Sequence, residues 1–216
     1  MVEQMLDEKY IVSTEGDLRA LYPGISPLAK SKCIDALDEH SVEFIKRSPF
    51  VCLGTQGRDG RADVSPRGDP AGFVQILDAT TLAIPDRPGN NRLDSIANIV
   101  ENPAVGLLFL IPGYDETLRV NGNAKLTNDP ALLEKMTVKG KLPRLAIVVE
   151  ISEIFLHCAK AFRRSKLWDQ ESHQNRSEMP SLAKMILDQT TGAPEDAAEQ
   201  QKIDDRLEES YKKSMY

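Results

Sequence analysis

The sequence lacks the features that would assign it to a membrane, to a secretory route or to nucleic acid. Its longest apolar run, residues 104–111, is far shorter than the ~20 residues of a membrane-spanning helix. Cys33, Cys52 and Cys158 are odd in number and have neither zinc-site nor disulfide-framework spacing. Aromatic residues make up only 6% of the chain and the net charge is −6, unlike a dedicated nucleic-acid binder. We expect a soluble, cytoplasmic protein without metal, membrane or nucleic-acid partners.

The composition present is that of one large globular domain with appendages. Residues 1–27 are expected to be irregular, and residues 28–48 repeat apolar side chains at helical spacing. Between residues 50 and 159, apolar segments alternate with turn residues, which predicts strands near 50–55, 62–66, 72–77, 81–85, 104–111, 116–127 and 145–157. Helices are predicted at 92–101 and 129–138. This order favours a small barrel or sandwich.

An acidic tail follows the predicted strands. Residues 169–209 hold eleven acids and four bases, and helices are predicted to start near Ser181 and Glu195. We therefore divide the chain into an irregular segment (1–27), a central domain (28–170) and a helical appendage (171–216). Ser181 and Lys184 also have the spacing of serine–lysine acylases, but the partner motifs of those enzymes are missing, so we interpret the pair as a helix start.

The stretch IPDRPGNNRLDS, residues 84–95, joins a predicted strand to a predicted helix. Free backbone N–H groups and the positive end of the helix dipole attract an anion there. The same dipole disfavours Arg92 in a first helical turn unless an anion is bound, and Arg87 lies nearby. The stretch therefore indicates a phosphate site. The alternative is that Asp86 and Asp94 merely pair with the two arginines at the surface.

Two other stretches could meet a ligand. A strand that ends in Ser-Pro-Arg-Gly, residues 65–68, exposes backbone groups and lets a flat ligand approach closely, although an ordinary tight turn would have the same sequence. Residues 157–168, HCAKAFRRSKLW, carry four cations and the only tryptophan. They indicate either a pocket for an anionic ligand beside Trp168, or a basic helix docked on the acidic tail with Trp168 in the core.

Three motifs, DVSPRGDPAG, IPDRPGNNRLDS and HCAKAFRRSKLW, occur in this order after a helix and the strand FVCLGT. In this arrangement the chain resembles the pyridoxamine 5′-phosphate oxidase-like superfamily, the FMN-binding split barrels, over about residues 28–170. The resemblance implies a mainly β fold with α-helices: a Greek-key split β-barrel with flanking helices and a helical C-terminal appendage. It also implies a homodimer with FMN at the subunit interface.

The resemblance further implies the residues of a site. Those beside the flavin ring would be Asp63, Val64, Ser65, Pro66, Arg67, Ile84 and Pro85. The ribityl chain and phosphate would be held by Arg87, Asn90, Asn91 and Arg92, and the dimer interface would bring in Thr117 and Arg119. The substrate pocket would be closed by Lys160, Arg164 and Trp168. No residue is assigned a catalytic role.

Departures from the true pyridoxamine phosphate oxidases argue against vitamin B6 as the substrate. Arg67 stands where their flavin-strand motif ends in lysine, and Asn91-Arg92-Leu93 replaces their Ser-Arg-Lys motif. The resemblance thus implies an FMN-dependent oxidoreductase that acts on an unidentified small molecule, with flavin as the acceptor of a hydride or electrons. Because Arg67 is cationic, we expect it to raise the reduction potential of the flavin.

Two alternatives to an FMN oxidoreductase stay open. One is a flavin-binding or redox-sensing protein without turnover, since the motifs contain no obvious catalytic acid or base. The other is a split barrel that binds haem, with His157 as an axial ligand, or a deazaflavin. The cations of residues 160–164 also predict an anionic substrate for an enzyme.

Overall fold

The N-terminal segment forms short helices. The structure, a computed structural model, describes residues 6–216, so residues 1–5 of the segment predicted to be irregular lie outside the described residues. The chain divides into two units, residues 1–33 and 34–216. The first unit contains a 3-10 helix, η1 (Glu8–Tyr10), and the helices α1 (Glu15–Ala20) and α2 (Pro27–Ser31). The side chains that cap them are Asp7, Thr14 and Ser26.

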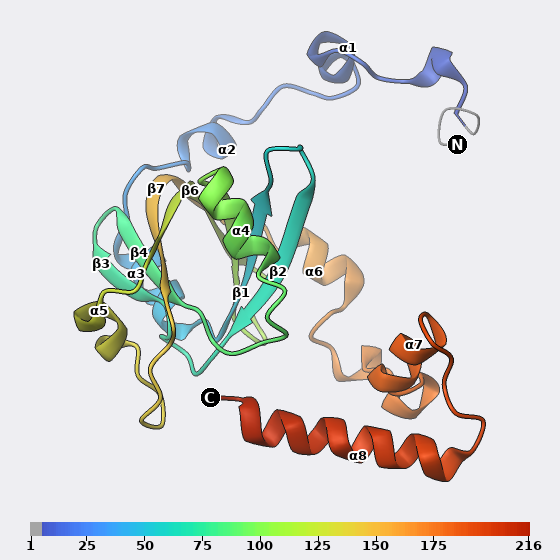
Figure 1. The fold of residues 1–216 in the computed structure, drawn as a ribbon. Coiled ribbons are helices and arrows are strands. Elements are labelled where there is room, and N and C mark those ends of the chain that lie inside the picture. The colour runs from blue at the N-terminus through green and yellow to red at the C-terminus, as the bar shows by residue number, and fades with distance from the viewer. Residues whose placement is uncertain (1–5) are drawn as a thin grey trace. The chain divides into compact units, whose positions relative to one another are not determined.

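A single antiparallel sheet forms the centre of the second unit (Figure 1). Its strands are β1 (Phe50–Gln56), β2 (Ala62–Gly68), β3 (Gln75–Asp78), β4 (Thr81–Pro85), β5 (Ala104–Leu110), β6 (Thr117–Thr127) and β7 (Ala146–His157). They lie in the order β2-β1-β5-β6-β7-β4-β3. Each strand overlaps one predicted segment, because buried and more exposed side chains alternate along strands such as β1. The predicted mainly β fold is confirmed.

The sheet curls until strands from distant positions meet. Four strands separate β2 from β4 in the sheet order. Nevertheless, Arg67 of β2 forms an ion pair with Asp86, which directly follows β4, at 2.6 Å between Nη1 and Oδ1. One hydrophobic core is enclosed, and its fully buried side chains include Ile45, Val51, Leu53, Leu82, Ile84, Leu107, Phe109, Leu118, Val120, Ile147, Val149 and Ile154. This arrangement is a split barrel, in which side-chain contacts join parts of the sheet that lie far apart in its strand order.

The two longest strands, β6 and β7, bend at a bulge. Their pairing register shifts between Asn121 and Gly122. A Cβ atom at Gly122 would collide with the carbonyl oxygen of Glu150 on β7. The close approach of the two backbones therefore requires glycine at this position.

The helix predicted over residues 28–48 is wrong as one continuous element. Its helical residues belong to α2 and to α3 (Glu39–Arg47), and between them Ile34 pairs with Ile154 of β7. The cause is local: Asp38 accepts the backbone N–H of Ser41 at 2.8 Å, and Ser41 in turn accepts the backbone N–H of Asp38, which starts a new helix. The hydroxyl of Ser41 also holds the pKa of the Asp38 carboxyl below its usual value.

Two other helices are shorter than predicted. They are α4 (Asp94–Glu101), which begins two residues later than expected, and α5 (Pro130–Lys135), which starts with the predicted proline. Helix α4 contacts β1, β2 and β6, and it buries Ser95, Ile96 and Ile99 (Figure 1). The first turn of α4 is thereby fixed beside the edge strand β2.

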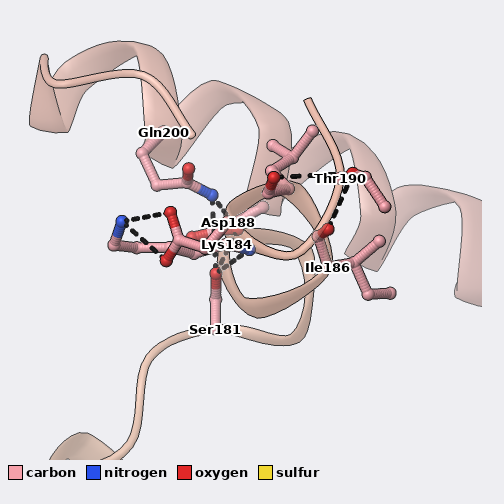
Figure 2. Close-up of polar contacts among 8 residues, drawn as sticks. Ser181, Lys184, Ile186, Asp188, Thr190 and Gln200 are labelled. Carbon is pink, nitrogen blue, oxygen red and sulfur yellow. Dashed lines mark hydrogen bonds and ion pairs between the residues drawn. The ribbon is translucent and has the colours of Figure 1, made fainter. Parts of the chain in front are cut away.

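The tail is helical, as its composition predicted. It contains α6 (Lys160–Ser165), the 3-10 helices η2 (Gln170–Ser172) and η3 (Arg176–Glu178), α7 (Leu182–Asp188) and α8 (Ala197–Ser214). Figure 2 shows that Ser181 caps α7 by accepting the backbone N–H of Lys184 at 3.1 Å, while the Lys184 ammonium pairs with Asp188. The interpretation of Ser181 and Lys184 as a helix start is confirmed. Among the described residues, no helix is long and apolar enough to cross a membrane.

The Gly122→Ala variant should lower the free energy of unfolding by about 3 kcal/mol, because backbone atoms of β7 block the new methyl group. Chemical denaturation measures this change. Gly106→Ala is the matched control, since its Cβ would meet only a side-chain oxygen of Asn121 at 3.5 Å. Equal stability of the two variants would contradict the close approach at the bulge.

Candidate functional site

A cavity of about 670 Å³ lies beside β2, the loop after β4 and the start of α4. Its volume falls within the roughly 300–1,000 Å³ of small-molecule sites. The two motifs that predicted ring and phosphate contacts therefore meet in space. The predicted site residues that line the cavity are Asp63, Ser65, Pro66, Arg67, Pro85, Arg87, Asn90, Asn91 and Arg92.

The other predicted site residues lie elsewhere. Val64 is 70% exposed on the opposite face of β2, where a shallow groove includes Arg119. The side chain of Ile84 is fully buried in the hydrophobic core, and Thr117 is buried at the start of β6. None of these four side chains lines the cavity in the described part of the chain. Their roles beside a flavin or across a dimer interface stay predictions.

Two crossed ion pairs form one wall of the cavity. The Arg67–Asp86 pair joins β2 to the loop after β4, and Arg87 of that loop pairs back to Asp69, just beyond β2, at 2.5 Å between Nε and Oδ2. Both pairs are shielded from solvent: 13% of the Arg87 side chain and 1% of the Asp69 side chain are exposed. Removing one partner of such a buried pair costs about 3–5 kcal/mol in typical cases, because the other charge is left buried without a partner.

The alternative to a phosphate site was that both Arg87 and Arg92 pair with aspartates at the surface. The structure shows such a pair for Arg92 only. Arg92 pairs with Asp94 at 2.8 Å, and both side chains are largely exposed. Arg87 does not pair with Asp86 as that alternative expected, but with the buried Asp69. Arg92 also lies before α4 and not in its first turn, so the predicted conflict with the helix dipole is relieved.

The loop that leads into α4 has an uncommon backbone. Asn91 and Leu93 have φ angles of 58° and 62°, in the left-handed region that most residues avoid. Leu93 occupies the N-cap position of α4, and no side chain caps the helix there. Backbone strain of this kind is common at ligand sites, and the uncapped first turn presents N–H groups at the cavity.

A chain of hydrogen bonds crosses the floor of the cavity. The buried Ser95 hydroxyl lies 2.7 Å from Oδ2 of Asp63 and 2.9 Å from Oγ of Ser65. The Ser65 hydroxyl also accepts a hydrogen bond from Nε of Arg67 at 3.3 Å. Sequence reasoning did not single out Ser95. The available signal was a polar residue on the apolar face of a predicted helix, next to Ile96.

The positive charge predicted for this site is largely compensated. The cavity-lining arginines Arg67, Arg87 and Arg92 each have an aspartate partner. One cationic side chain of the lining remains for an anion. Arg144, before β7, lines the cavity, and among residues 6–216 no carboxylate pairs with it. Nη1 of Arg87 is buried and has no hydrogen-bond partner in the described chain.

Sequence reasoning also missed Arg144. It reaches the cavity because β4 and β7 pair with Pro85 opposite Ala146, and because the backbone N–H of Asp86 donates to Leu145 O at 2.9 Å. Nothing in the local sequence around Arg144 reveals that register. The residue was therefore invisible until strands from two distant parts of the chain were aligned.

The basic segment around α6 attaches to the loop between β5 and β6. Arg163 pairs with Asp115 at 3.0 Å, and Nε1 of Trp168 donates to Tyr114 O at 2.8 Å. Trp168 also stacks on Phe162 and is only half-buried, so it is not a core residue. The ion pair of Arg163 is with Asp115 and not with the acidic tail. In the described chain, the cavity is not lined by Lys160, Arg164 or Trp168, and their substrate role stays a prediction.

Comparison with solved structures gives distant similarities. HupZ of Group A Streptococcus is 16% identical, with 56% of this chain and 93% of that chain covered and a TM-score of 0.46. General Stress Protein 26 of Bacillus anthracis str. Sterne is 16% identical, with 53% and 88% covered and a TM-score of 0.42. An FMN-binding protein of Syntrophomonas wolfei is 12% identical, with 54% and 88% covered and a TM-score of 0.41. All three TM-scores lie below 0.5, so we draw no function from these structures.

The sequence itself carries a stronger similarity. No curated protein matches it. The sequence model of a protein family described as pyridoxamine 5′-phosphate oxidase matches residues 37–158. The match spans more than half of the 216 residues and includes the sheet and every predicted ring and phosphate residue of the cavity. The chain therefore belongs to the pyridoxamine 5′-phosphate oxidase family.

Proposed function

We propose that this chain binds FMN in the cavity beside β2 and α4 and acts as an oxidoreductase on a small molecule. The observation that carries the proposal is Arg144, a cationic side chain of the cavity lining that has no carboxylate partner among residues 6–216, in the same lining as the uncapped start of α4. Membership of the pyridoxamine 5′-phosphate oxidase family supports a flavin as the ligand. Bound FMN would supply the acceptor for a hydride or electrons.

The residues of the cavity fit the two ends of FMN. The phosphate would be held by Arg144 and by backbone N–H groups of the first turn of α4. The ring would lie along β2, an edge strand that pairs only with β1 and therefore exposes backbone groups. Arg67, held by Asp86, would face the polar edge of the ring.

The lining favours a flavin over haem. Among the described residues, no histidine, cysteine, methionine or tyrosine lines the cavity, so none of the usual axial ligands of haem iron is at hand. His157, the sequence candidate, ends β7 and is not part of the lining. The same lining has no group that separates FMN from a deazaflavin, and the absorption spectrum of the bound cofactor distinguishes the two.

We further propose that a second copy of the chain covers the outer face of the sheet. That face carries a shallow groove with Gly54, Val64, Gly106 and Arg119, and Val64 is a largely exposed apolar side chain. A partner there would bring Arg119 to the interface, as the family resemblance predicted, whereas Thr117 is buried and does not line the groove. Light scattering of the purified protein tests this: the mass of two chains supports the dimer, and the mass of one chain refutes it.

Turnover separates an oxidoreductase from a passive flavin binder. We expect NADH or NADPH to bleach the flavin absorbance of the loaded protein anaerobically, and an electron acceptor to restore it. A cytoplasmic location fits these donors and stays a prediction from the sequence. Lys160 and Arg164 predict an anionic substrate. If the substrate is anionic, inorganic phosphate or simple carboxylates should inhibit turnover competitively.

The Arg144→Ala variant should raise the dissociation constant of FMN about 10- to 150-fold, because the phosphate loses a charge-assisted hydrogen bond worth roughly 1.5–3 kcal/mol. Fluorescence titration of FMN into apoprotein measures it. Arg61→Ala is the control, since Arg61 is highly exposed on the turn between β1 and β2 and pairs with Asp59. An unchanged affinity in Arg144→Ala would remove Arg144 from the phosphate site.

Arg67 and Asp86 should shift the reduction potential of bound flavin in opposite directions. Arg67→Met removes a positive charge and should lower the potential, whereas Asp86→Asn leaves the Arg67 charge uncompensated and should raise it. Dye-coupled reduction measures both potentials, and thermal unfolding checks that both variants are folded. Shifts of the same sign would contradict an electrostatic role for the pair.

A further inference from the structure

Tyr216, two residues beyond the end of α8, reaches the cavity wall from a distant part of the sequence. Its hydroxyl donates to Oδ1 of Asp69 at 2.8 Å, and Oδ2 of the same carboxylate holds Arg87. The Arg87 guanidinium lies 5.8 Å from the centre of the Tyr216 ring, and Lys139 Nζ lies 5.0 Å from it. One side chain thus contacts both members of an ion pair of the wall and one further cation, Lys139.

We propose that Tyr216 is a positioning residue for the cofactor site: it fixes Asp69, and through Asp69 the guanidinium of Arg87, a residue of the cavity lining. This inference rests on the proposed FMN site. Arg87 uses Nε for Asp69 and Nη2 for the carbonyl oxygen of Met136 at 2.7 Å. Nη1 is buried without a partner in the described chain, so Asp69 and Met136 supply the hydrogen bonds that hold the guanidinium. Any rotation of the Asp69 carboxylate would therefore move a side chain that lines the cavity.

The contacts of Tyr216 support positioning and not occlusion. Neither Tyr216 nor any described residue of α8 lines the cavity, so the tyrosine lies behind the ion pair and not in the path of a ligand. The hydrogen bond to Asp69 raises the pKa of Tyr216 above its usual value of about 10, so its hydroxyl remains a donor at neutral pH.

Helix α8 connects this contact to the rest of the tail. Its 18 residues span about 27 Å, and Gln200, near its start, is its only buried residue. Near that end, Ser181 Oγ donates to Asp204 Oδ1 at 2.7 Å, and Gln200 Nε2 donates to the same oxygen at 2.9 Å. The other end is followed by Tyr216, whose hydroxyl donates to Asp69, just beyond β2. The helical appendage is thereby tied to the cavity wall through one side chain.

The test compares Tyr216→Phe, which keeps the ring and loses the hydroxyl, with Tyr216→Ala, which loses both. Tyr211→Phe is the matched control, because Tyr211 is a 43% exposed tyrosine on α8. We expect Tyr216→Phe to raise the dissociation constant of FMN about 5- to 10-fold, Tyr216→Ala to raise it further, and Tyr211→Phe to leave it within about twofold of wild type. Wild-type affinity in Tyr216→Phe, or tighter binding, overturns the proposal.

Hydrogen exchange of the apoproteins gives a readout that does not depend on FMN. Backbone amides of residues 85–93 should exchange faster in Tyr216→Phe than in wild type, with exchange in β5 and β6 unchanged. If wild type fails to bind FMN, the proposed function fails, and this exchange still decides the role of Tyr216. Faster exchange confined to the loop supports positioning, whereas unchanged or globally faster exchange overturns it.

Discussion

The crossed ion pairs between β2 and the loop after β4 are the constraint on which the rest of the structure depends. They join parts of the sheet that four other strands separate in its order, and they do so with side chains. The exchange is reciprocal, since each segment contributes one arginine and one aspartate. A closure made this way leaves β2 as an edge strand beside the cavity, with its backbone groups available to a flat ligand.

The same pairs decide the electrostatics of the site. Sequence motifs rich in arginine indicate a strongly cationic pocket, but the aspartates of those motifs compensate most of the charge. Anion binding must then depend on a few donors: Arg144 and the backbone N–H groups of the first turn of α4. A site of this design can position a phosphate without excess positive charge that would attract any anion. Tyr216 extends the arrangement by linking the tail to the Asp69–Arg87 pair.

Most helices and strands whose position depends on nearby residues could be predicted from the sequence, and features that depend on distant residues could not. Apolar segments bounded by turn residues place all seven strands, and proline and serine place the starts of α5 and α7. The break before α3 escaped prediction because the capping interaction of Asp38 with Ser41 competes with a continuous apolar pattern. The bulge at Gly122 depends on the neighbouring strand β7, which the pattern of β6 alone does not contain.

The candidate site was predictable in its motifs and not in its pairings. Arg67 and Arg87 stand out in the sequence. Each pairs with the aspartate next to the other arginine, Arg67 with Asp86 and Arg87 with Asp69, and these pairs form only because the sheet curls. Arg144 enters through the register of β4 with β7, and Tyr216 through the length of α8. Arg144 follows Arg87 by 57 positions and Tyr216 follows it by 129, so only the folded chain brings these residues together.

The visible absorption spectrum of the purified protein, recorded before and after addition of FMN and gel filtration, tests the central claim most directly. The account predicts the absorption bands of oxidised flavin in the protein fraction, with about one FMN per chain after loading. A colourless protein from which added FMN separates completely would contradict a flavin site in this cavity.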